Sequence, residues 1–114
     1  MVELQEHCKL IRCILPKGKA LPIIQALKDE RGIIMANFNF ARGTGRITHR
    51  DYRSRVTQTE KEVLYVIVTE DKAEEIFAFI YDTAGIGEPH GGIMYQCALS
   101  GSTEYLLPDV PEEQ

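Results

Sequence analysis

The sequence lacks several features that define common protein classes. No apolar run approaches the roughly 20 residues that a membrane-spanning helix requires. The first ten residues contain two acids and no apolar stretch of the kind found in signal peptides, so we expect a cytoplasmic protein. The P-loop pattern G-x-x-x-x-G-K-[ST] is absent, and so are a nucleophile elbow and a second carboxylate in a matched loop. We therefore expect no enzymatic activity.

Cysteine is scarce and poorly spaced for disulfide or metal chemistry. Cys8, Cys13 and Cys97 cannot all pair within one chain, and none belongs to a C-x-x-C pair. In a reducing compartment we interpret all three as small apolar residues of strands. A metal site would require His49, His90 and the cysteines to converge. Their spacing does not show this, so we predict no metal site. A trimeric metal-binding or metal-tolerance-type protein of the same fold stays as the alternative.

Charge is unevenly distributed along a mildly acidic chain. The 114 residues carry a formal net charge of −4, which argues against general attraction to nucleic acid. Tyr65 is also the only obvious stacking aromatic on the predicted central strands, so we expect no nucleic-acid partner. Five of the seven arginines nevertheless cluster in one segment: Arg42, Arg46, Arg50, Arg53 and Arg55. The residues from Glu104 onward include four acids and no base, which predicts a basic loop and an acidic tail.

Hydrophobic periodicity predicts four strands and two helices in a single domain, residues 1–114. The predicted strands span residues 8–15, 33–41, 63–68 and 93–99. Apolar stripes from Ala20 to Leu27 and from Ala73 to Ala84 predict the helices. Gly32 is a suitable C-terminal stop for the first helix, and Asp71 a plausible N-cap for the second.

Three segments lie outside these elements. Residues 42–60 have no apolar periodicity and exceed the usual connection length, which is typical of functional loops. Residues 85–92 form a glycine loop, and residues 100–114 a proline-broken tail. The motifs ARGTGR and GIGEPHGG could each converge backbone N–H groups on an anion, although a pair of glycines is equally consistent with a simple turn.

The order strand, helix, strand, long loop, strand, helix, strand predicts an α+β fold. It is the βαββαβ order of a ferredoxin-like sandwich, with a four-stranded antiparallel sheet and both helices on one face. The other face then has no cover within the chain. We expect it to carry the polar residues Lys9, Asn37, Asn39 and Gln96 and the apolar residues Leu10, Tyr65 and Ile67. We infer a self-associated oligomer that covers this face.

From about Lys9 to Leu99 the sequence resembles the P-II nitrogen-regulatory signal-transduction proteins. IRCILPKGKALPIIQAL is similar to their first strand and helix, and GTGR to the G-x-G-R entry of their long T-loop. VLYVIVTEDKAEEI is similar to their third strand and second helix, and AGIGEPHGGIMYQ to their B-loop. The resemblance makes residues 42–60 the T-loop and residues 85–92 the B-loop.

This resemblance implies a homotrimer with adenine-nucleotide sites between subunits and a T-loop that contacts a transporter or an enzyme. The nucleotide-binding residues that it implies are Gly43, Thr44, Gly45, Arg46, Lys61, Gly85, Gly87, Glu88, His90, Gly91 and Gly92. The T-loop residues that it implies for partner binding are Arg50, Tyr52, Arg53 and Arg55. The protein would be a regulator that responds to a small effector, without a cofactor of its own.

Three departures from the P-II pattern alter the expected effector. Gly92 stands in the place of the B-loop lysine, after an inserted EPH stretch, and the two arginines expected after the last strand are missing. Ile47 replaces the glutamine that helps to hold magnesium and 2-oxoglutarate in the family. Each lost cation would have made a charge-assisted hydrogen bond of roughly 1.5–3 kcal/mol. We therefore expect AMP, ADP or a small anion such as bicarbonate to bind in preference to magnesium-ATP.

Overall fold

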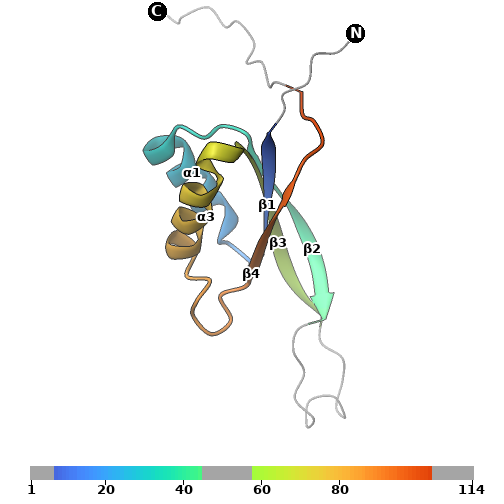
Figure 1. Ribbon diagram of the computed structural model, residues 1–114. Helices are drawn as coiled ribbons and strands as arrows, with labels where there is room; N and C mark the ends of the chain where they lie inside the picture. The colour runs from blue at the N-terminus through green and yellow to red at the C-terminus, as the bar shows by residue number, and fades with distance from the viewer. Residues whose placement is uncertain (1–6, 45–57, 104–114) are drawn as a thin grey trace, which may run out of the picture.

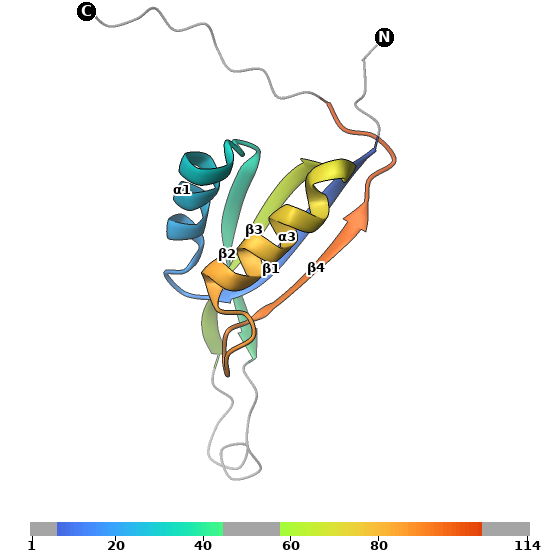
Figure 2. The same ribbon diagram turned by 60° about the vertical axis from the view of Figure 1, so that its left-hand side comes forward.

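The computed structural model describes residues 7–44 and 58–103. A four-stranded antiparallel sheet with strand order β2-β3-β1-β4 carries two helices on one face (Figures 1 and 2). The elements are β1 (Cys8–Pro16), α1 (Ala20–Arg31), β2 (Ala36–Thr44), β3 (Gln58–Thr69), α3 (Glu70–Ala84) and β4 (Ile93–Ala98). This arrangement confirms the predicted ferredoxin-like βαββαβ sandwich.

The core lies between the helices and one face of the sheet. Alternate residues of β1, among them Ile11 and Leu15, are fully buried, as are Leu64 and Val66 of β3. The helices contribute their apolar stripes to the same cluster: Ala20, Ile23, Leu27, Ala73, Ile76, Ile80 and Ala84. The period of 2 in the strands and of 3.6 in the helices therefore identified the buried faces correctly.

Glycines end both helices, and the first of them, Gly32, was predicted to do so. Gly32 adopts a left-handed φ of 67° and donates its backbone N–H to the carbonyl groups of the last turn of α1. Gly85 does the same for α3 with a φ of 70°. The predicted N-cap of α3 is wrong, because Thr69 occupies that position and Asp71 lies in the first helical turn. The hydroxyl group of Thr69 instead hydrogen-bonds to Asp71 and lowers the pKa of its carboxyl group.

The hairpin strands extend further into residues 42–60 than the sequence pattern predicted. β2 spans Ala36–Thr44, three residues later than the predicted 33–41, and β3 begins at Gln58, five residues before the predicted start. The strands therefore include the first three and the last three residues of the predicted 42–60 loop. The added pairs are Arg42 with Glu60, Gly43 with Thr59 and Thr44 with Gln58. Backbone pairing needs no apolar side chains, so the loss of apolar alternation gave no signal of where the ladder ends.

The sheet face opposite the helices is here called the open face. Strand alternation places Leu10, Tyr65 and Ile67 on it, as predicted, together with Asn37 and Asn39. The prediction for Lys9 and Gln96 is wrong, because they alternate with the open-face residues and belong to the helix side. Cys8 and Cys13 are buried in β1, as expected of small apolar residues, whereas Cys97 of β4 is exposed. The expected tail is described only to Thr103.

Candidate functional site

The first glycine motif forms the end of the β2–β3 hairpin. Gly43 and Thr44 are the last residues of β2, where their backbones pair with Thr59 and Gln58. Gly45 and Arg46 lie outside the described residues. The predicted partner-binding residues also lie outside them: Arg50, Tyr52, Arg53 and Arg55. The structure therefore describes the entry to the arginine-rich segment.

The second glycine motif, residues 85–92, is a compact loop between α3 and β4. The backbone N–H of Glu88 donates to the carbonyl of Gly85 at 3.0 Å, and that of Gly91 donates to the carbonyl of Glu88 at 2.9 Å. His90 is exposed and has a left-handed φ of 62°, which is uncommon for a residue other than glycine. These bonds fold the loop on itself, as a tight turn requires.

Two glycines of this loop have no room for a side chain. A Cβ atom on Gly91 would overlap the carbonyl oxygen of Gly85, and one on Gly92 would overlap the carbonyl oxygen of Ile14. Gly92 also has a φ of 108°, which L side chains rarely adopt. A lysine could not replace Gly92 without local rearrangement. The missing cation of the predicted B-loop thus has a structural basis in this chain.

The glycine loop and the hairpin end lie at the same end of the sheet. β1 ends at Pro16, which pairs with Lys61 near the start of β3, and β4 begins at Ile93, which pairs with Ile14. Both ribbon views place the 85–92 loop and the hairpin end below the body of the molecule (Figures 1 and 2). Lys61 is half-buried and lies by alternation on the open face. The fold thus gathers the predicted binding residues that it describes at one end.

An exposed ion pair joins the β1–α1 turn to the hairpin. Lys17 Nζ lies 2.8 Å from Glu60 Oε2. The hydrogen bond and the charge of Lys17 lower the pKa of Glu60, and the same contact raises the pKa of Lys17. Arg42, paired opposite Glu60 across the strands, adds to the effect on Glu60. The cations of the described residues at this end are therefore partly neutralised by acids.

Glu62 of β3 holds the start of α1. Its carboxylate is 4% exposed and accepts the backbone N–H of Gly18 at 2.9 Å and that of Ala20 at 2.8 Å. These N–H groups stand at the helix N-terminus, where no preceding residue can accept them and the helix dipole favours negative charge. We did not predict this residue. The signal was an acid that alternates with Leu64 and Val66 on the buried face of a central strand.

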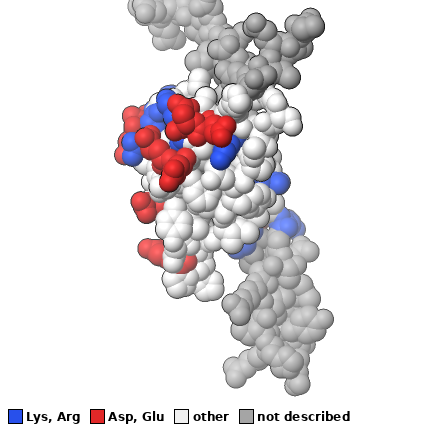
Figure 3. All heavy atoms as spheres, in the orientation of Figure 1, with Lys and Arg blue, Asp and Glu red and all other residues white. Residues whose placement is uncertain are grey.

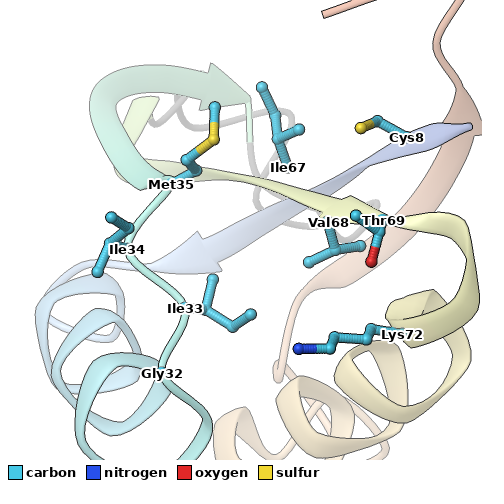
Figure 4. A pocket seen from close by; sticks show the side chains of 9 residues that line it. All are labelled: Cys8, Gly32, Ile33, Ile34, Met35, Ile67, Val68, Thr69 and Lys72. Carbon is cyan, nitrogen blue, oxygen red and sulfur yellow. The ribbon is translucent and has the colours of Figure 1, made fainter. Parts of the chain in front are cut away.

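A separate hollow of about 180 Å³ lies at the other end of the sheet. Residues of β1, of the α1–β2 connection, of β3 and of α3 line it: Cys8, Gly32, Ile33, Ile34, Met35, Ile67, Val68, Thr69 and Lys72. Its wall is largely apolar, and the Lys72 side chain extends across it toward the Ile33 segment (Figure 4). None of these residues was a predicted site residue. The two ends of the sheet therefore differ in character.

Metal binding gains no support from the described residues. Within residues 7–44 and 58–103 there is no group of three His, Cys, Asp or Glu side chains that could hold an ion. His49, which the alternative required, lies outside these residues. Burial raises the pKa of the Cys13 thiol to about 12. The alternative stays a prediction. No helix in the described part of the chain is long and apolar enough to cross a membrane.

Comparison with solved structures defines the class of fold. Neither the family models nor the curated proteins give a match to the sequence. The fold matches Arabidopsis thaliana PII bound to citrate with a TM-score of 0.64 and 18% identity, over 84% of this chain and 78% of that one. It matches the Bacillus subtilis GlnK–ATP complex with a TM-score of 0.65 and 13% identity, over 88% and 85%. A second GlnK structure gives 0.64 and 15%, over 82% and 86%.

The chain thus belongs to the ferredoxin-like class of α+β folds. Within that class it has the fold of the P-II proteins, which confirms at the level of fold the resemblance predicted from the sequence. The sequence is divergent, because the identities lie between 13% and 18%.

Proposed function

We propose that the chain is a P-II-like regulatory protein, not an enzyme, that binds a small effector and acts on another protein in the cytoplasm. The observation that carries this proposal is the position of the two glycine motifs at one end of a sheet with the P-II fold. In this proposal the protein is a homotrimer, and the effector binds between subunits near Gly43–Arg46 and residues 85–92. Residues 42–60 act as a T-loop that contacts a transporter or a metabolic enzyme.

The effector is an adenine mono- or diphosphate or a small anion. Two solved structures of this fold carry ATP and citrate, so both ligand classes are reasonable for it. Gly92 cannot carry a lysine side chain as the backbone stands, and Glu88 Oε2 lies 3.1 Å from the position that a Cβ atom on Gly85 would take. A carboxylate at the carboxyl end of α3 adds negative charge where a triphosphate would need cations. Arg46 then supplies most of the positive charge.

Calorimetry against AMP, ADP, ATP with and without magnesium, and bicarbonate tests the proposal. AMP, ADP or bicarbonate should bind more tightly than magnesium-ATP. Arg46→Ala should weaken that binding by roughly tenfold or more, since it removes a charge-assisted hydrogen bond. Arg50→Ala is the matched control, because it removes an arginine of the same segment that the proposal assigns to partner contact. Equal binding by the parent and by Arg46→Ala would place the site elsewhere, and magnesium-ATP as the tightest ligand would refute the effector assignment.

The homotrimer has its own test. Light scattering at micromolar concentration should give three times the subunit mass of 12.9 kDa. A mass of one subunit under these conditions would contradict the proposal, since sites between subunits could not then form.

A further inference from the structure

A polar row crosses the middle of the open face. Tyr65 of β3 and Tyr95 of β4 both pair with Arg12 of β1, and Asn37 of β2 pairs with Tyr65. The rows on either side are largely apolar. They contain Leu10, Ile67 and Cys97 on one side, and Ile14, Val63 and Ile93 with the polar Asn39 on the other. One polar residue from each of the four strands therefore stands in line between mainly apolar rows.

Arg12 is held by the two tyrosines but keeps unused donors. Its Nη2 donates to the Tyr65 hydroxyl at 3.3 Å, and its guanidinium carbon lies 5.1 Å from the centre of the Tyr65 ring. Hydrogen bonds from the guanidinium group to the side chains of Tyr65 and Tyr95 raise the pKa of Arg12. Its Nε is buried and has no hydrogen-bond partner among the described residues. A guanidinium group has five N–H donors, four of them on its two Nη atoms. The two tyrosines use at most two of these four, so the Nη atoms can still donate to an anion.

The other residues of the row also present donors. Each tyrosine oxygen accepts from Arg12, which leaves its own O–H proton free to donate. The Oδ1 atom of Asn37 accepts the backbone N–H of Phe38 at 2.8 Å, so the amide NH₂ is the free end of that side chain. The row therefore offers a guanidinium, two hydroxyl groups and an amide, all as donors toward one face.

The described open face contains no acidic side chain that could accept hydrogen bonds from these donors. Among the open-face residues of the described strands there are two cations, Arg12 and Lys61, and no Asp or Glu. The surface view agrees: acidic atoms gather over the helices, whereas Lys and Arg atoms without acidic neighbours lie along the sheet side (Figure 3). None of the residues in 7–44 and 58–103 therefore supplies an acidic acceptor to this row.

We propose that the row Asn37–Tyr65–Arg12–Tyr95 is a binding site for a small oxyanion, either a carboxylate or a phosphate. The planar guanidinium fork matches the paired oxygens of such groups, and the flanking hydroxyl groups bind the same oxygens. A hollow of about 350 Å³ beside Asn37, Tyr65 and Ile67 gives room for the body of an organic anion. All four side chains come from one subunit, and the proposal does not rest on the nucleotide site proposed above.

The site also has a consequence for assembly. If copies of the chain meet on this face, their Arg12 side chains approach one another, and no acid of the described open face neutralises them. A bound oxyanion offsets that repulsion at the junction. It would therefore promote self-association.

Calorimetry with acetate and with inorganic phosphate, each at constant ionic strength set with chloride, tests the site and distinguishes the two ligand classes. At least one of them should bind saturably. Arg12→Gln should weaken the binding by roughly tenfold or more, the ratio expected for a lost charge-assisted hydrogen bond. Tyr65→Phe and Tyr95→Phe retain the rings and remove only the hydroxyl groups, so each should weaken binding several-fold. Lys9→Gln is the control, because it removes a cation of the same strand from the helix side.

Several outcomes would overturn the site. Binding of neither anion would do so, as would equal binding by Arg12→Gln, or an equal loss in Lys9→Gln, which would indicate general charge attraction. If Arg12→Gln fails to fold, the two phenylalanine variants test the site instead, and unchanged anion binding by both of them would refute it. If the assembled protein binds no anion because a neighbouring copy fills the row with its own carboxylate, the small-anion site is also refuted. In an Arg46→Ala background, Arg12→Gln should still weaken the acetate or phosphate binding, which separates this site from the effector site.

Discussion

Replacement of Glu62 by glutamine should destabilise the protein far more than a single surface carboxylate normally does. The Glu62 carboxylate is buried and accepts two backbone N–H groups at 2.8 and 2.9 Å, one from each side of the α1 N-terminus. Glutamine retains one acceptor oxygen and turns an NH₂ group toward the second N–H. The variant therefore loses one charge-assisted hydrogen bond and leaves a buried donor without an acceptor.

The magnitude follows from these two losses. A hydrogen bond to a charged group contributes roughly 1.5–3 kcal/mol, and an unsatisfied buried donor costs roughly 1–3 kcal/mol, so we expect Glu62→Gln to lower the free energy of unfolding by about 2.5–6 kcal/mol. For a domain near this size, each kcal/mol corresponds to roughly 4–8 °C in Tm, so the midpoint should fall by roughly 10 °C or more. Thermal unfolding followed by circular dichroism measures this at a fixed protomer concentration.

Glu60→Gln provides the control two residues away on the same strand. Glu60 pairs with Lys17 at 2.8 Å, but both side chains are exposed, and such ion pairs contribute little to stability. Its midpoint should stay close to that of the parent. If Glu62→Gln unfolds at the same temperature as Glu60→Gln, the buried carboxylate does not hold α1 and the reasoning is wrong.

Three further predictions concern the glycine loop, the buried thiol and the ion pair. Gly92→Lys restores the lysine of the P-II pattern and should lower the free energy of unfolding in urea by roughly 1–3 kcal/mol. The φ of 108° is strained for lysine, and its Cβ atom would overlap the Ile14 carbonyl oxygen. An unchanged unfolding midpoint would contradict the described loop. Cys13 should resist iodoacetamide at about pH 8 until the protein unfolds, because only the thiolate reacts and its pKa is raised to about 12; peptide mass spectrometry that finds Cys13 alkylated in folded protein would refute this. The lowered pKa of Glu60 means that its ion pair stabilises the folded protein above the ordinary carboxylate pKa and that this stabilisation is lost as the pH falls through the lowered value. The parent should therefore lose more stability than Glu60→Gln between neutral and acid pH. Parallel pH profiles of the two Tm values would exclude a contribution of the pair.

The elements that could be predicted from the sequence are those in which apolar residues recur with the period of a helix or a strand. The apolar stripes of both helices and the open-face positions of Leu10, Tyr65 and Ile67 are confirmed, and Gly32 ends α1 as expected. Strand ends were missed where backbone pairing continues through Arg42, Glu60 and other polar residues. The N-cap of α3 was missed by two residues, because Thr69 and Asp71 are both capping residue types and only the backbone angles distinguish them.

The candidate site was predictable only as sequence motifs. Glycines at 85–92 indicated a tight loop, but the contact between Gly92 and the Ile14 carbonyl depends on pairing between β1 and β4 that no local pattern contains. The role of Glu62 depends on a contact with residues more than forty positions earlier in the chain. The Arg12 row was missed for the same reason, since its members come from four strands and meet only in the folded sheet.

The two carboxylates at the start of β3 also fix the alignment of this strand against the β1–α1 turn. Glu60 and Glu62 are separated by one residue and contact Lys17 and the amides of Gly18 and Ala20. A slip of one position would turn Glu62 toward the open face and bring Val63 to the helix N-terminus, because successive strand residues point to opposite faces. A slip of two positions would bring Leu64 or Glu60 to the helix N-terminus, and in either case the contact between Glu60 and Lys17 would break. β3 is therefore held in a single alignment against the β1–α1 turn, so the strand that follows the arginine-rich segment keeps a constant position relative to α1.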